Sequence, residues 1–84
     1  MRSEPEIMQE MLEIIRNGPI LVTHLMYKAN LNSAQIKTYV GKALELELIS
    51  KMDSKYVLTE AGLKMIKELR HLNVLLVIPK ATPY

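Results

Sequence analysis

The sequence has no cysteine, no phenylalanine and no tryptophan. Without cysteine, the chain cannot form disulfides, bind zinc through thiolates or use a thiol nucleophile. No apolar run approaches the roughly 18 residues of a membrane span, and the N-terminal "MRSEPEIMQE" is too acidic for a signal peptide. We therefore expect a soluble, cytoplasmic protein with no membrane partner.

The hydrophobic residues that are present make up 49% of the 84 residues and are mostly aliphatic, with six methionines among them. A chain of this length supports one small core. The net charge is only +2, but residues 20–42 contain three lysines and no acidic residue. Positive charge therefore gathers in the middle of the chain, where a polyanion would bind.

Two helices are predicted near the start of the chain from the spacing of apolar residues. The first spans Pro5 to Arg16, with Ser3 as its cap, and ends at the "NGP" of residues 17–19. A short extended segment, Ile20–Val22, follows. Thr23 is then expected to cap a second helix of barely two turns.

Only the residues "NLN" separate the second helix from a third, with neither glycine nor proline between them. Asn30 tolerates the left-handed conformation better than most residues and can therefore end the second helix. Leu31 is expected to point inward, and Asn32 or Ser33 to cap a third helix that runs to about Leu48. The interruption is thus a tight corner between two helices.

Beyond the third helix, Ser50–Met52 and Tyr56–Leu58 are predicted to form two short strands around the turn "DSK". A final helix is expected to begin near Thr59. This order of elements is typical of a winged helix-turn-helix, a mainly α fold with a small β-hairpin. We expect one such domain over residues 1–72, followed by an apolar C-terminal tail over residues 73–84.

The third helix has two contrasting sides. Ile36, Val40 and Leu44 lie at the centre of its predicted buried side, and polar residues occupy the opposite arc, which suits the major groove of DNA. That arc can also be an ordinary solvated face, and hairpin lysines can serve only to protect an edge strand. The corner before this helix and the hairpin after it favour DNA binding. The expected DNA contacts are Ser33, Gln35, Lys37, Thr38 and Lys42 in the helix, Lys28 before it, and Lys51 and Lys55 in the hairpin.

No pattern typical of catalysis or metal binding is recognisable. His24 and His71 lie far apart in the sequence, without cysteine or a carboxylate pair at ligand spacing. There is also no glycine-rich phosphate loop or nucleophile motif. We therefore expect no enzymatic activity, no metal and no cofactor.

Three short motifs lie in and around the predicted corner and hairpin. They are "MYKANL" at Met26–Leu31, the "LI" of Leu48–Ile49, and the pattern YxLTxxG from Tyr56 to Gly62. In these motifs the sequence resembles an archaeal family of small winged-helix proteins, over roughly residues 7–70. The resemblance implies DNA binding and, as in several members, a dimer joined through the C-terminal helix. The chain departs from the family in its short predicted last helix, where relatives often carry a long coiled-coil arm.

The predicted tail contains five consecutive apolar residues before Pro79. Burying each of them is worth roughly 1.5 to 3 kcal/mol, and a monomer this small has little surface to cover them. Two copies can pair these residues as strands or extend their last helices into a shared bundle, whereas in a monomer the tail would fold back on the first helix. The expected dimer contacts are Leu69, Leu72, Val74, Leu75, Leu76, Val77 and Ile78.

These observations together predict a homodimer that binds double-stranded DNA in a sequence-specific or semi-specific way and regulates transcription, associated with the nucleoid. An abundant nucleoid-type protein is an alternative role for the same DNA-binding fold. A second alternative, from a different class, is a winged helix that binds another protein and not DNA. The modest net charge, the scarcity of arginine, and Glu45 and Glu47 near the end of the third helix keep that alternative open.

Overall fold

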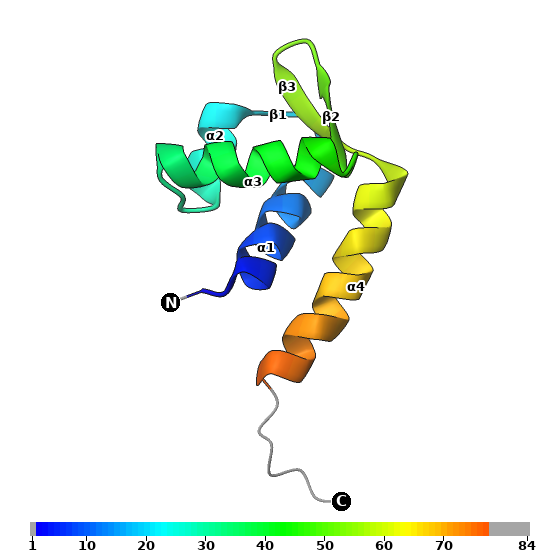
Figure 1. The fold of residues 1–84 in the computed structure, drawn as a ribbon. Coiled ribbons are helices and arrows are strands. Elements are labelled where there is room, and N and C mark those ends of the chain that lie inside the picture. Colours follow the sequence, from blue (N-terminus) through cyan, green and yellow to red (C-terminus); the bar gives the residue numbers. More distant parts are fainter. Residues whose placement is uncertain (1, 78–84) are drawn as a thin grey trace, which may run out of the picture.

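The computed structural model describes residues 2–77, with side chains described through residue 72. Figure 1 shows one helix crossing the front of the molecule, a β-hairpin above it and a long helix running down one side. The predicted mainly α fold with a small β-hairpin is confirmed. The elements in chain order are α1 (Glu4–Arg16), β1 (Ile20–Leu21), α2 (Val22–Lys28), α3 (Ser33–Glu45), β2 (Ile49–Met52), β3 (Lys55–Leu58) and α4 (Glu60–Val77).

α1 begins with a capping box. The Ser3 side chain accepts a hydrogen bond from the Glu6 backbone N–H at 3.3 Å, and the Glu6 carboxylate accepts one from the Ser3 N–H at 2.9 Å. The bond from the Ser3 backbone lowers the pKa of Glu6, because it favours the charged carboxylate. The expected cap is therefore confirmed, and it satisfies backbone groups that the first turn leaves unpaired.

The core lies between α1, α2, α3 and α4. Its largest fully buried side chains are Met11, Leu12 and Ile15 of α1, Leu25 of α2 and Ile66 of α4. α1 and α4 are also joined at the surface by Arg70, whose guanidinium donates two hydrogen bonds to the Glu13 carboxylate, the shorter at 2.7 Å. α1 therefore packs mainly against α4 and also against α2, whereas α3 packs against α2 and β2.

The sheet has three antiparallel strands in the order β1-β3-β2. β1 is short but real, since Ile20 pairs with Tyr56 and Leu21 with Lys55. The expectation that Thr23 caps α2 is wrong. The chain leaves the sheet after Leu21, which is the N-cap without a side-chain hydrogen bond, and the helix starts at once with Val22.

The corner between α2 and α3 has the predicted geometry. Asn30 is left-handed, with φ 56°, and Leu31 is buried. The Leu31 N–H donates to the Met26 carbonyl at 3.0 Å, which closes the end of α2. Asn32, and not Ser33, caps α3. A left-handed asparagine thus ends a helix where a glycine would often be found.

α3 ends at Glu45, three residues before the predicted end at Leu48. Glu47 is left-handed, with φ 60°, and so cannot continue the helix. Its carbonyl accepts a hydrogen bond of 2.6 Å from the Thr59 hydroxyl, which also caps α4 by accepting from the Gly62 N–H at 3.0 Å. Thr59 therefore holds the turn after α3 against the start of α4.

α4 is longer than expected, because it runs through Val77. The short last helix predicted from the sequence is therefore wrong, since residues 73–77 continue the helix. The division into a domain over residues 1–72 and a C-terminal tail stays a prediction. Pairing of residues 74–78 as strands between two copies disagrees with the helical backbone of residues 74–77. Ile78 and the rest of the predicted tail lie outside the described residues.

Candidate nucleic-acid interface

α3 presents the polar surface that its sequence predicts. Its buried residues are Ile36, Tyr39, Val40 and Ala43, which anchor the helix in the core. In Figure 1 the helix lies at the front of the molecule with the hairpin above its C-terminal end. The expected DNA-contacting residues of this helix are all exposed: Ser33, Gln35, Lys37, Thr38 and Lys42.

The prediction that Leu44 is buried is wrong, since its side chain is 38% exposed. Leu44 lies in the last turn of α3, and the chain reverses at Glu47 just beyond it. The buried side of the helix is therefore centred on Ile36 and Ala43, with Tyr39 and Val40 on either side, and it is rotated away from Leu44.

Gln35 serves the N-terminus of its own helix. Its side-chain oxygen accepts a hydrogen bond from the Asn32 N–H at 3.0 Å, while its N–H donates to the Asn32 side chain at 2.8 Å. This capping box engages the amide oxygen and leaves the amide NH₂ of the side chain for another partner. Gln35 can therefore donate to a base edge in its present position. To bind adenine through both its amide oxygen and its amide nitrogen, it must leave the cap.

Thr38 is bonded back to the helix. Its hydroxyl donates to the Ala34 carbonyl at 3.1 Å. The hydroxyl oxygen still has lone pairs toward solvent, so that Thr38 can accept a hydrogen bond from a base but does not offer one. Like Gln35, it is a candidate for reading bases with only part of its hydrogen-bonding capacity.

The two lysines of α3 differ in their surroundings. Lys42 Nζ lies 3.7 Å from a carboxylate oxygen of Glu4 and 6.0 Å from the centre of the Tyr39 ring. Lys37 is exposed and has no such partner in the described part of the chain. Lys37 is therefore free to meet a phosphate or a guanine, whereas Lys42 must first release a carboxylate.

The two hairpin lysines project from opposite faces of the sheet. Lys51 is paired across the strands with Tyr56, and Lys55 with Met52. Side chains alternate between faces along a strand, and directly paired residues share a face. Consistent with this, Lys51 Nζ lies 6.0 Å from the centre of the Tyr56 ring. The structure therefore does not bring both lysines to one DNA-facing side of the hairpin.

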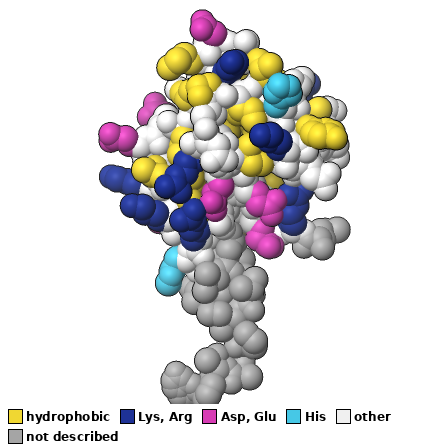
Figure 2. Space-filling model, turned by 180° about the vertical axis from the view of Figure 1, so that it is seen from behind, with side chains coloured by type: hydrophobic (Ala, Val, Ile, Leu, Met, Phe, Trp, Pro, Cys, Tyr) yellow, Lys and Arg dark blue, Asp and Glu magenta, His cyan; other side chains and the backbone are white. Residues whose placement is uncertain are grey.

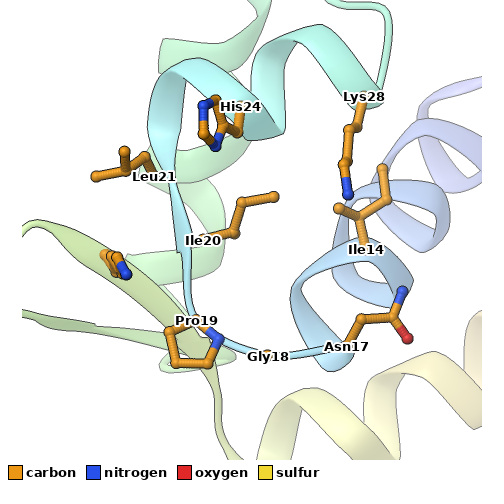
Figure 3. Close-up of a pocket in the computed structure, with 9 residues that line it drawn as sticks. Ile14, Asn17, Gly18, Pro19, Ile20, Leu21, His24 and Lys28 are labelled. Atoms are coloured by element: carbon orange, nitrogen blue, oxygen red, sulfur yellow. The ribbon is translucent and has the colours of Figure 1, made fainter.

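Lys55 lines a pocket of about 270 Å³ together with Lys28, another expected DNA contact. The pocket lies between the end of α1, the turn at residues 17–19, β1 and α2, and no residue of α3 lines it. Figure 3 shows Lys28 and His24 reaching into it from α2. Lys28 and Lys55 thus form a group of their own, away from the polar arc of α3.

Basic residues are not confined to α3 and the hairpin. Figure 2, seen from behind, shows Lys and Arg side chains gathered on the α4 side of the molecule, with acidic side chains beside them. α4 contributes exposed Lys64, Lys67 and Arg70. Positive charge alone therefore does not single out α3 as the interface.

The residues expected at a dimer contact fall into three groups. Leu69 is 9% exposed and packs into the protomer's own core, whereas Leu72 is 41% exposed. Val74, Leu75, Leu76 and Val77 belong to α4, but their side chains lie outside the described part, and Ile78 lies beyond it altogether. Among the expected dimer contacts in the described part of the chain, Leu72 is therefore the one whose side chain is exposed.

Two contacts near the start of the chain have no counterpart in the predicted set of site residues. The Arg2 guanidinium donates to the carbonyls of Ala29 and Asn30 in the α2–α3 corner, and Glu4 pairs with Lys42. Residues so far apart in sequence share no local pattern, so that only the folded structure reveals them.

No group of three or more potential metal ligands occurs among the described residues. Within the same part of the chain, no helix is long and apolar enough to cross a membrane.

A helix-turn-helix made by α2 and α3, followed by a β2–β3 hairpin, defines a winged-helix protein. The model of the family described as winged helix-turn-helix matches residues 1–76. The chain therefore belongs to the winged helix-turn-helix family, as predicted from its sequence.

Two relatives come from the archaeon Methanocaldococcus jannaschii. The uncharacterized protein MJ0287 is 35% identical over 71 residues, which cover 84% of this chain and 73% of that protein. The uncharacterized protein MJ0290 is 32% identical over 68 residues, which cover 81% of this chain but only 32% of the longer protein.

Two solved structures have the same fold. Sso10a-2, a DNA-binding protein from Sulfolobus solfataricus, superposes with a TM-score of 0.75 at 19% identity, covering 88% of this chain and 81% of that one. RV1404 from Mycobacterium tuberculosis gives a TM-score of 0.62 at 20% identity, covering 98% and 64% respectively. Because the sequence identity is low, these matches show that the fold is shared.

Proposed function

We propose that the protein binds double-stranded DNA by placing α3 in the major groove, with Lys51 of the hairpin contacting the backbone. The observation that carries this proposal is the exposed polar arc of α3, mounted on a helix-turn-helix with its hydrophobic side buried. The similarity in fold to Sso10a-2, which is a DNA-binding protein, supports it. A role in regulating transcription, in association with the nucleoid, is the activity that suits such a module.

The hydrogen bonds within α3 favour weak sequence preference. Gln35 and Thr38 are the two uncharged base-reading candidates, and both spend part of their bonding capacity on their own helix. Phosphate contacts, which carry no sequence information, are left to Lys37 and Lys51. This supports semi-specific binding, and hence a nucleoid-type role, as the second candidate.

Fluorescence anisotropy of a labelled random-sequence duplex, titrated at several salt concentrations, tests the proposal. Binding should weaken linearly in a plot of log affinity against log salt, because phosphate contacts release counterions. Absence of binding at low salt would reject the proposed function and favour a protein partner for the same face.

A pair of single substitutions then tests which surface binds. Lys37→Ala on α3 and Lys64→Ala on α4 remove the same charge from exposed helical positions. We expect Lys37→Ala to weaken binding and reduce the salt slope by about 1, and Lys64→Ala to have little effect. Equal losses in the two variants would contradict the assignment to α3.

We also propose that the protein is a homodimer joined through the C-terminal part of α4. In sequence, Leu72, Leu75 and Leu76 recur at helical spacing, and the helix continues past Leu69, the last of its described side chains that is buried. A dimer joined in this way would present two α3 helices to successive turns of DNA and favour a palindromic site.

Sedimentation equilibrium tests the assembly. The full-length chain should sediment with twice the protomer mass, and Leu76→Asp should lower that mass toward one protomer. Ala61→Asp, at an exposed position in the first turn of the same helix, is the matched control and should remain dimeric. A dimer that survives Leu76→Asp unchanged would place the contact elsewhere.

A further inference from the structure

The segment before α1 makes an unusual contact with the α2–α3 corner. Arg2 donates from Nη1 to the Ala29 carbonyl at 2.8 Å and from Nη2 to the Asn30 carbonyl at 3.0 Å. These carbonyls close the C-terminal end of α2, where a cation is favoured. The guanidinium therefore ties α1 to the corner from which α3 starts. In Figure 1 the N-terminal segment lies below that corner.

Glu10 holds Arg2 in place. Its carboxylate pairs with the same guanidinium nitrogen that bonds to Ala29. Glu10 lies in the middle of α1, which is anchored by fully buried residues such as Met11. The corner is thus connected through Arg2 and Glu10 to a helix that is anchored in the core.

Glu4, two residues after Arg2, contacts α3 directly. Its carboxylate lies 3.7 Å from Lys42 Nζ, and both side chains are at least half exposed, at 74% and 50%. An exposed ion pair of this kind is weak, so that a DNA phosphate can take the place of Glu4. The carboxylate would remain nearby, however, and repel the phosphate.

We propose that residues 2–4 control the DNA-binding face in two opposing ways: Arg2 positions α3, and Glu4 competes with phosphate for Lys42. This inference rests on the proposed function. Arg2 acts through the corner and touches no DNA, whereas Glu4 acts by occupying a lysine that would otherwise bind DNA. The two effects have opposite signs, which makes them separable by experiment.

Glu4→Ala and Glu10→Ala provide the decisive comparison, because each removes one negative charge from α1. Glu4→Ala should raise DNA affinity roughly two- to fivefold and steepen the salt slope by up to about 1. Glu10→Ala should lower affinity roughly twofold, because Arg2 loses the carboxylate that orients it. A smaller fraction of molecules then has the α2–α3 corner in the conformation that binds DNA. If both variants raise affinity equally, net charge explains the result and the proposal is overturned.

Arg2→Lys separates the position of Arg2 from its charge. Lysine keeps the charge but lacks the planar fork that bonds two carbonyls together. Affinity should therefore fall roughly threefold in Arg2→Lys, close to the loss in Arg2→Ala. Binding like that of the unchanged protein would reject a positioning role for Arg2.

Amide hydrogen exchange gives a readout without DNA. The Leu31 N–H donates to the Met26 carbonyl within the corner, and it should exchange faster in both Arg2 variants, whereas buried amides of α1 should not change. Failure of the unchanged protein to bind DNA would reject the proposed function alone, since Leu31 exchange still decides whether Arg2 holds the corner. Unchanged exchange in both variants would overturn that part of the inference.

Discussion

The two corners that flank α3 share one backbone conformation but are stabilised differently. Asn30 before the helix and Glu47 after it are both left-handed, with φ 56° and 60°. Asparagine tolerates this conformation, whereas a residue such as glutamate pays roughly 1–2 kcal/mol for it. The first corner is therefore favoured locally, and the second exists because Thr59 and the start of α4 hold it.

The largest effect should come from Gly62→Ala, which would break the second corner. A Cβ at this position would lie 2.1 Å from the Leu48 carbonyl oxygen, a backbone atom that cannot move aside easily. We expect a loss of about 3 kcal/mol in the free energy of unfolding, measured by urea denaturation. Gly41→Ala is the control: it has open space around it and should stabilise α3 by about 0.5–1 kcal/mol.

Thr59→Val should have the next largest effect. It keeps the shape of the side chain but removes the hydroxyl that bonds to the Glu47 carbonyl and caps α4. The free energy of unfolding should fall by about 1–2 kcal/mol. Thr59→Ser retains the hydroxyl and should lose clearly less, so that equal losses would show that the hydrogen bonds are unimportant.

Glu47→Gly and Asn30→Gly compare the two corners directly. Glycine relieves the left-handed strain of Glu47, and after its greater entropy in the unfolded chain is subtracted, a gain of about 0.5 kcal/mol remains. Asn30→Gly should be close to neutral, because asparagine is strained little. The melting temperature of Glu47→Gly should thus be about 2–4 °C higher than that of Asn30→Gly. A higher melting temperature for Asn30→Gly would show that Asn30, and not Glu47, is the strained residue.

The smallest effect concerns the ion pair between α1 and α4, away from both corners. Hydrogen bonds from Arg70 lower the pKa of Glu13 below its ordinary value. The folded pKa is lower than the unfolded one, so this stabilisation is complete above about pH 4.3 and is lost as the pH falls through the folded pKa. The stability difference between the unchanged protein and Arg70→Met should therefore be constant near neutrality and disappear in acid.

The first corner shows what the sequence can predict. Asn30, the buried Leu31 and the capping Asn32 act within a few residues of one another, and their expected roles are confirmed. The sequence predicts an end of α3 that lies three residues too late, because Glu47 carries no local signal for a left-handed turn. Its conformation depends on Thr59, twelve residues further along the chain.

The candidate site was predictable to a similar extent. Helical periodicity correctly predicts that Lys37 and Thr38 are exposed on α3, since this prediction depends only on residue spacing. Periodicity does not show that Lys55 projects away from Lys51, because that depends on the register of the hairpin. Nor does it show that Glu4 meets Lys42, because their contact depends on how α1 packs beneath α3.

The two lysine–tyrosine contacts also give the protein an intrinsic optical signal. Lys42 lies over Tyr39 and Lys51 over Tyr56, each at 6.0 Å from the ring centre, and the chain has no tryptophan to mask tyrosine emission. Lysines that move from the rings to phosphates would alter the electrostatic environment of both phenols. The unlabelled protein should therefore report DNA binding through its own fluorescence, and comparison with Tyr39→Leu and Tyr56→Leu would show how much of the change comes from the helix and how much from the hairpin.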